Sequence, residues 1–300
     1  MYTLGLFVCF IVLAFLYNIL VAGPRMRQEA EAAPRITMDE VKPFWDRLEQ
    51  DCLPFARIHI REAGNQKVRG RRIGGAPMRF EDESDWPVSQ VTGRPMMFLG
   101  QVDFSEIRGL EGFPENGILQ VFTSFEMVGD DGECERVIRW DAEPSGNAKM
   151  DIPEEIKKQS RHTKFFSNRA RQTGLCLDFE PGVAIAHPYI WPYNEEGDVY
   201  LENRLPENDA VARIIDTWEE RADEISESYG THWMGGYPRF VQEDIRVWSE
   251  KFQKLDRTLL HLGWDDDIQL GDAGEANLMI SREDLIKRNF QKSVLTWDCS

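Results

Sequence analysis

Two stretches of this chain, one near residue 75 and one near residue 236, open with the same Gly-Gly-x-Pro sequence. Gly74-Gly75-Ala76-Pro77 is followed within three residues by Phe80, and Gly235-Gly236-Tyr237-Pro238 is followed by Phe240. With 23 Gly and 15 Pro in 300 residues, composition alone would give roughly 0.1 such matches per chain. A repeated structural unit leaves this kind of self-similarity, so the sequence predicts an internal duplication.

The likeness continues downstream of both turns. Residues 96–100 (MMFLG) parallel residues 259–263 (LLHLG), and each run is followed by a polar turn containing Gly and then by an apolar run. The spacing between the two features differs by six residues, so the alignment needs a deletion, and convergent turn chemistry is the alternative. The predicted repeat-like halves are about 53–140 and 230–299, with an intervening segment at 141–229.

The local patterns predict both strands and helices. Short apolar runs bounded by Gly and Pro indicate strands at 57–61, 97–102, 118–125, 136–140, 175–179 and 183–186. Apolar residues at helical spacing predict a helix between Asn208 and Gly230, a helix opening at Thr37 and a short one from Glu283. We therefore expect an α+β fold: a single mixed, strand-rich domain over residues 37–300, with an internal duplication.

The beginning of the chain predicts a membrane anchor. Residues 3–23 carry no charge, and 13 of the residues from Leu4 to Val21 are Leu, Ile, Val or Phe. About 20 apolar residues span the hydrocarbon core of a bilayer. The alternative is a cleaved signal peptide, with Ala30-Glu31-Ala32 as its cleavage site. An N-terminal transmembrane helix (1–23) followed by a linker (24–36) is favoured, because no Lys or Arg precedes the run and the run exceeds a usual signal sequence.

Charge predicts orientation and partners. Arg25, Arg27 and Arg35 follow the span and no basic residue precedes it, so the positive-inside rule predicts a single-pass membrane protein with a cytoplasmic C-terminal domain. The lipid bilayer, reached through residues 3–23, is the first predicted partner. The remaining chain carries the whole net charge of −17, which disfavours nucleic acid and attracts a basic protein partner.

Known catalytic templates are absent from the sequence. There is no GxSxG, P-loop, GxGxxG or HExxH motif, and the five His residues are dispersed. The five Cys residues include no CxxC pair, which argues against a zinc site or a disulfide framework. We expect no cofactor, and a non-enzymatic role is favoured over an enzymatic one.

One acidic cluster is the best candidate for a metal site. It comprises Asp265-Asp266-Asp267, Asp272 and Glu275, with His261 nearby. Clustered carboxylates suit Mg²⁺ or Ca²⁺, but Leu270 occupies the position where a calcium loop needs Gly. A solvated turn between strands is the favoured interpretation, so no metal is predicted.

Two sets of residues are candidates for binding. Lys157, Lys158 and Arg161 lie in a basic segment, which either pairs with acidic surface of the same chain or docks an acidic partner or anionic lipid. A second hypothesis, of an unrecognised enzyme or small-ligand module, places a polar cleft between the repeats. Its candidate residues are Gln242, Asp244, Arg246, Asp266 and Asp272.

Several motifs in combination resemble a known family. The runs GGAP, RPMMFLGQVDF, PENGILQVF, GGYPRFVQEDIR and GDAGEANLMISREDL are similar to those of the YwqG-like family of bacterial proteins, a domain of unknown function, over about residues 53–299. Leu270 departs from the Trp usual in that family. The resemblance implies a mixed α/β domain with an internal duplication, no established reaction, and an immunity-like or partner-binding role. We therefore expect a membrane-anchored, non-enzymatic protein-interaction module.

Overall fold

The computed structural model describes residues 52–62, 70–81, 85–128, 132–145, 148–158, 165–184, 229–242 and 244–299. These residues belong to one compact unit, 46–300. Several predicted features lie outside them: the span at 3–23, the linker, the helix opening at Thr37, most of the helix at 208–230, and Arg161. Within the described ranges, no helix is both long enough and apolar enough to cross a membrane.

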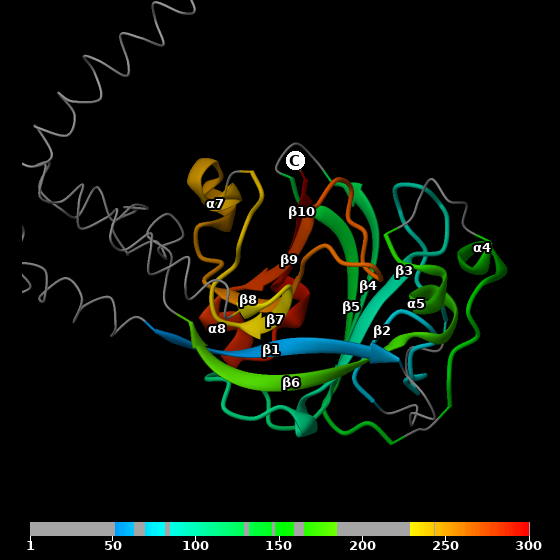
Figure 1. Cartoon of the computed structure of the whole chain (residues 1–300), viewed down its shortest axis with the longest axis horizontal. Helices are drawn as coiled ribbons and strands as arrows, with labels where there is room; N and C mark the ends of the chain where they lie inside the picture. The colour runs from blue at the N-terminus through cyan, green and yellow to red at the C-terminus, as the bar shows by residue number, and fades with distance from the viewer. Residues whose placement is uncertain are drawn as a thin grey trace, which may run out of the picture. The chain divides into compact units, whose positions relative to one another are not determined.

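Strands are the main regular secondary structure in the described part of the chain. They are β1 (Leu53–Glu62), β2 (Arg72–Ile73), β3 (Met97–Asp103), β4 (Ile118–Met127), β5 (Cys134–Asp141), β6 (Leu175–Ala184), β7 (His232–Gly235), β8 (Arg257–Leu262), β9 (Glu275–Ile280) and β10 (Val294–Asp298). Their order around a closed antiparallel barrel is β1-β6-β2-β3-β4-β5-β10-β9-β8-β7. In Figure 1, β1 and β6 run side by side as the long blue and green strands.

The helices among the described residues are short. They are α4 (Glu154–Lys157), α5 (Asn168–Thr173), α7 (Ile245–Trp248) and α8 (Arg282–Ile286), with 3₁₀ turns η2 (Phe104–Glu106), η6 (Glu250–Phe252) and η7 (Phe290–Lys292). None of the four α-helices exceeds six residues. The predicted α+β class is therefore wrong, because the described residues form a mainly-β barrel. The helices are too short to build a layer of their own, and α4, α5 and α8 bury only one or two residues each.

The main hydrophobic core lies inside the barrel. Side chains alternate between the two faces of a strand, and a single buried cluster takes residues from all ten described strands, from Ala56 and Ile58 in β1 to Leu295 in β10. Only the interior of a closed sheet lets every strand contribute to one core. Smaller clusters, around Phe122 and around Phe252, lie on the outer face beneath the segments that follow β2 and β7.

The strand order divides the barrel into two matching sets. The first half, β1–β5, contains the run β2-β3-β4-β5, and the second half, β6–β10, contains β7-β8-β9-β10; the runs meet where β5 lies beside β10. The first strand of each half is exchanged, because β1 pairs with β7 and β6 pairs with β2. An approximate twofold rotation would place each strand on its counterpart. The internal duplication stays a prediction of the sequence, and β6 lies in the segment that the sequence comparison left outside both halves.

The cross-strand registers give the equivalent positions. A bulge falls between Phe98 and Gly100 in β3 and between Thr258 and Leu260 in β8. Matching the bulges places the Gln101–Gln120 pair of β3 and β4 on the His261–Asn277 pair of β8 and β9. The Leu-Gly alignment of residues 96–100 with 259–263 differs from this correspondence by three residues.

The paired glycines form the equivalent turns after β2 and β7. All four have a positive φ, between 60° and 73°, a conformation that favours glycine. A Cβ on Gly74 would lie 2.2 Å from the Ala170 carbonyl oxygen, and one on Gly235 would lie 2.6 Å from that of Pro54. Each turn therefore starts a covering segment at a point where two backbones touch.

Candidate functional site

An open groove lies beside the connection between β3 and β4. It holds about 770 Å³ and is lined by Pro114, Trp140 and Pro144, among others. An adjacent hollow of about 420 Å³ shares Pro114 with it. Gly117 makes the Trp140 wall possible, because a Cβ there, at φ +100°, would lie 2.4 Å from the indole ring. Trp140 packs against Phe290 at a centroid distance of 4.8 Å and stays partly exposed.

The charge in this groove is acidic. Glu115 and Glu143 line it, both are exposed, and neither side chain has a partner within the described structure. Arg288 is the basic residue of the same wall, but it donates to the carbonyl oxygens of Gly112, Leu285 and Phe113. Burial lowers the pKa of Arg288. Within the described residues, Arg288 therefore forms no ion pair with either rim carboxylate.

A charged cluster occupies the outer face of the second half. We call Trp233, Arg239, His261, Glu275 and Asn277 the Arg239–His261 cluster. The Arg239 Nε donates to both Glu275 oxygens, at 2.9 and 3.1 Å, and Nη2 donates at 2.5 Å. The His261 ring stacks on Trp233 with centroids 3.5 Å apart, and the Arg239 guanidinium lies over the same indole at 5.1 Å.

Hydrogen bonds determine the tautomer of His261. Asn277 donates from Nδ2 to the Arg239 carbonyl at 2.6 Å, so its Oδ1 faces His261 Nδ1 at 2.8 Å. Because Oδ1 only accepts, Nδ1 must carry the proton. The other nitrogen, Nε2, is buried without a hydrogen-bond partner among the described residues and lies 3.7 Å from Glu275 Oε2. Burial, followed by the charges of Arg239 and His232, lowers the pKa of His261 well below its usual value, against the Asn277 hydrogen bond.

In the first half, the positions that correspond to the Arg239–His261 cluster hold uncharged side chains. Counting from the paired glycines, Met78 corresponds to Arg239, and by register Ile118 corresponds to Glu275. Met78 and Ile118 pack together in an apolar cluster. Gln120 donates to the Met78 carbonyl at 2.7 Å, as Asn277 does to that of Arg239, and to Gln101 Oε1 at 2.9 Å. The two outer faces therefore share hydrogen-bond geometry but differ in ionisable groups.

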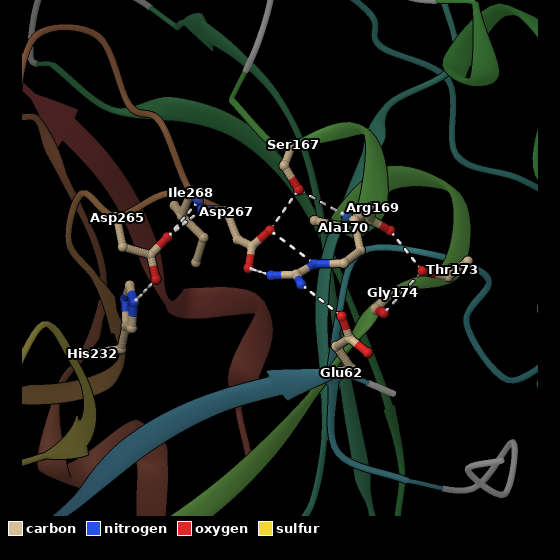
Figure 2. Close-up of polar contacts among 10 residues, drawn as sticks. All are labelled: Glu62, Ser167, Arg169, Ala170, Thr173, Gly174, His232, Asp265, Asp267 and Ile268. Atoms are coloured by element: carbon tan, nitrogen blue, oxygen red, sulfur yellow. Dashed lines mark hydrogen bonds and ion pairs between the residues drawn. The ribbon is translucent and has the colours of Figure 1, made fainter. Parts of the chain in front are cut away.

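The acidic run 265–267 is held by the fold. Figure 2 shows Asp265 pointing toward His232 while Asp267 points the opposite way, toward Ser167 and Arg169. Asp265 accepts from His232 Nε2 at 3.0 Å and from the backbone N–H groups of Asp267 and Ile268. Burial raises the pKa of Asp265, but these hydrogen bonds outweigh it and the net shift is downward.

Asp267 joins the second half to α5. It accepts from Ser167 Oγ at 2.7 Å and forms an ion pair with Arg169, which also donates to Glu62 at 2.9 Å. Ser167 is in addition the N-cap of α5. Figure 2 shows Arg169 lying between Asp267 and Glu62. No group of three or more possible metal ligands occurs among the described residues, and Asp266 lies exposed between its two paired neighbours.

The His232–Asp265 pair resembles part of a catalytic triad but is not arranged as one. A triad histidine accepts the nucleophile's proton on the nitrogen that faces away from the acid. In His232 that nitrogen, Nδ1, accepts from the backbone N–H of Gly263 at 3.2 Å.

Cys134 is a buried cysteine in β5. Burial is the main cause that raises the pKa of its thiol, to about 12. Neither His232 nor Cys134 is set up for nucleophilic chemistry.

The five predicted cleft residues are distributed over several local contacts. Asp244 caps α7, and its carboxylate accepts from the buried Arg246, which is 1% exposed and also donates to the Leu255 carbonyl. Gln242 donates to Asp298 Oδ2 and to the Cys299 carbonyl. Asp266 and Asp272 are exposed on the surface. The structure thus brings Asp244 and Arg246 together, as an ion pair.

The structure describes two of the three candidate residues in the basic segment, Lys157 and Lys158. Lys157 and Lys158 both pair with Glu154, at 2.7 and 3.7 Å, on the exposed side of α4. Arg161, the third residue of this set, lies outside the described residues, and both interpretations of the segment stay predictions. Trp86 donates from Nε1 to the Met96 carbonyl and packs on Phe122.

Sequence reasoning missed Trp140, Arg288 and Arg239. The sequence pattern places Trp140 only at the end of the predicted strand 136–140, and its counterpart in β10 is Trp297. Arg239 could have been found by asking where the two Gly-Gly-x-Pro segments differ in charge, since Met78 and Arg239 follow the respective prolines directly.

Comparison with known proteins gives a family but no activity. No curated protein matches the chain. The family model described as "Domain of unknown function (DUF1963)" matches residues 71–299, a range that includes every strand from β2 to β10. Because that match covers more than half of the sequence, the chain belongs to this family of domains of unknown function.

Proposed function

We propose that the domain is a non-enzymatic binding module that holds a basic segment of a protein partner in the groove beside Trp140. The carrying observation is that Glu115 and Glu143, which have no side-chain partner among the described residues, lie at the rim of an open groove walled by an aromatic ring and two prolines. A Lys or Arg side chain would find carboxylates at the rim and the face of an indole below them. The net charge of −17 favours the same class of partner.

The observations on His232 and Cys134 support a binding role over catalysis. An immunity-like role, the narrower likeness to YwqG-like proteins, and docking through Lys157, Lys158 and Arg161 stay predictions of the sequence. The same holds for attachment to a bilayer through residues 3–23 with a cytoplasmic domain, which protease access to the C-terminus in membrane vesicles would check.

A direct binding experiment tests the groove. The probe is a fluorescently labelled hexa-arginine peptide, titrated with the full chain and followed by anisotropy. Glu115→Lys/Glu143→Lys is expected to weaken binding by about tenfold, because two uncompensated carboxylates are reversed. Glu126→Lys/Glu250→Lys is the matched control: both residues are exposed on other segments, and the change in net charge is the same.

The control separates the groove from general attraction. Equal weakening in the two variants would mean that the peptide senses only net charge, and the proposal would fail. Trp140→Ala adds a charge-neutral test, in which lost affinity with unchanged unfolding supports contact with the indole. For the natural partner, a photo-crosslinker at Ser145, which is exposed in the groove wall, should attach to a Lys- or Arg-containing segment. An adduct confined to acidic segments would contradict the proposal.

A further inference from the structure

The charged character of the Arg239–His261 cluster is not required by the fold. The first half fills the corresponding positions with Met78, Ile118, Gln101 and Gln120, and all four of these residues are buried. Burying an ion pair costs desolvation energy, and replacing it with packed apolar residues is often neutral or stabilising. The molecule therefore contains its own uncharged alternative, which points to a role other than stability for Arg239, His261 and Glu275.

His261 carries a buried polar atom that the native hydrogen bonds leave unused. The residue is 0% exposed, its Nδ1 is committed to Asn277, and Nε2 faces the Glu275 carboxylate 3.7 Å away. A buried group without a partner costs free energy and calls for an explanation. A proton on Nε2 would supply one, because the N–H could then donate to Glu275 after a shift of about 1 Å to ordinary hydrogen-bond length.

Arg239 provides the route to solvent. Its side chain is 36% exposed, whereas that of Glu275 is 11% exposed and that of His261 is buried. A guanidinium has five N–H donors. Only Nε and Nη2 of Arg239 bond to Glu275, so among the described residues Nη1 is available to a ligand. The planar fork of a guanidinium matches two oxygens of a carboxylate or phosphate. Its seat on Trp233 keeps that fork oriented.

We propose that Arg239 binds a small oxyanion of the carboxylate or phosphate class. On binding, the Glu275 carboxylate exchanges its hydrogen bonds from Arg239 for one from His261, which takes up one proton. The anion replaces Glu275 in the hydrogen bonds from Nε and Nη2 of Arg239. A proton from solvent bonds to Nε2 of His261, and the resulting imidazolium donates to the freed Glu275 carboxylate. The net charge of the three residues rises by one as the anion arrives.

The surrounding charges determine whether anion binding favours or opposes protonation of His261. Arg239 and His232 oppose a positive charge on His261, while Glu275, with Asp298 opposite it on β10, favours one. An anion on Arg239 offsets the charge that opposes protonation and leaves Glu275 free to accept. Anion binding therefore raises the pKa of His261, and by reciprocity the affinity for the anion rises as the pH falls. The change is at most about tenfold per pH unit, the limit for one proton.

Calorimetry measures both parts of the proposal. Inorganic phosphate and acetate, as separate probes for the two anion classes, are titrated into the full chain in buffers of different ionisation enthalpy. Because the heat then varies with the number of protons exchanged, the slope gives proton uptake directly. For whichever anion binds the wild-type chain, we expect an uptake that approaches one proton per anion at mildly acid pH.

The first half supplies variants that suit the fold. Arg239→Met copies Met78 and should weaken anion binding at least about tenfold, since a bidentate contact is lost. Arg94→Met removes an equally positive, well-exposed arginine elsewhere and should leave binding unchanged. His261→Gln copies Gln101 and should still bind the anion, but without proton uptake and without the rise in affinity at lower pH.

A spectroscopic measurement on the wild-type chain removes dependence on the variants. In ¹⁵N-histidine NMR, the Nε2 signal of His261 should change from a bare to a protonated nitrogen when the anion is added at constant pH. The proposal is overturned if neither anion binds in the millimolar range, if Arg239→Met and Arg94→Met behave alike, or if proton uptake persists in His261→Gln. An unchanged Nε2 signal at saturating anion would overturn it as well.

Discussion

The two halves of the barrel place different chemistry on the same backbone scaffold. Each half has a Gly-Gly-x-Pro turn, a bulged strand, and an amide that donates to the carbonyl directly after the proline. In the first half these features surround Met78 and Ile118, and in the second half they surround Arg239 and Glu275. The shared geometry belongs to the fold, so the differing side chains are the better guide to function.

The largest expected loss of stability comes from breaking the ion pair in the segment that covers the second half. The second half is covered by α7, where Arg246 is paired with the Asp244 carboxylate at 1% exposure. Asp244→Ala should lower the free energy of unfolding by about 3–5 kcal/mol, because it leaves a buried guanidinium without its counter-charge. Urea denaturation measures this change. The double variant Asp244→Ala/Arg246→Met should cost less than Asp244→Ala alone, and a larger cost would show that the pair does not act as a unit.

The equivalent turns should respond alike. Gly74→Ala and Gly235→Ala should each cost about 2–4 kcal/mol, because a Cβ would collide with a backbone oxygen at positive φ. Gly93→Ala is the matched control: its φ is +69° but no atom lies within 4 Å of the added Cβ. It should cost only about 1 kcal/mol. Thermal or urea unfolding would contradict the shared role of the turns if Gly74→Ala cost no more than Gly93→Ala.

Lowering the pH should reduce the free energy of unfolding through His261 in the second half, whereas its counterpart Gln101 in the first half does not titrate. His261 has a pKa well below its usual value in the folded chain, so below about pH 6.5 the unfolded chain binds the extra proton and stability falls. The slope approaches about 1.4 kcal/mol per pH unit until the folded pKa is reached. His261→Gln should remove this part of the slope between pH 6.5 and 5.5, as urea unfolding in anion-poor buffer would show. An identical slope in both proteins would assign the titration to other groups.

Exchanging the charged pair for its counterpart should have the smallest effect. Arg239→Met/Glu275→Ile gives the second half the Met–Ile pair of the first and should change the free energy of unfolding by no more than about 1 kcal/mol. Glu275→Ile alone should be more costly, because Arg239 then lacks its partner over Trp233. Chemical denaturation of the two variants side by side makes the comparison. A strongly destabilised double variant would mean that the charges are needed for folding.

The sequence could predict much of the local structure. The strands at 97–102, 118–125 and 136–140 are confirmed as parts of β3, β4 and β5, and the short helix near Glu283 is confirmed as α8. These predictions succeed because apolar runs and glycine turns depend on neighbouring residues. The α+β class failed because local patterns mark where a helix begins but not how long it is, and the α-helices among the described residues have only four to six residues.

The candidate site was less predictable. Asp244 and Arg246 look like ligand residues in sequence, yet their side chains bond to one another. Asp265 and Asp267 are neighbours in the chain but point in opposite directions, one to His232 and the other to Arg169. Residue type alone does not reveal whether a carboxylate has a partner, because the partners here lie about 33 and 98 residues away.

What the sequence by itself determined is where the chain turns and which segments are strands, since Gly-Gly-x-Pro and apolar alternation act through local sterics. Only the tertiary structure decided that β1 and β6 are exchanged between the halves and that the bulges align Gln101 with His261. Register and closure depend on hydrogen bonds between distant strands, and a shift of one residue would move a side chain to the opposite face. Nε2 of His261 lies beside Glu275 and behind Arg239 only because the strands pair in this register.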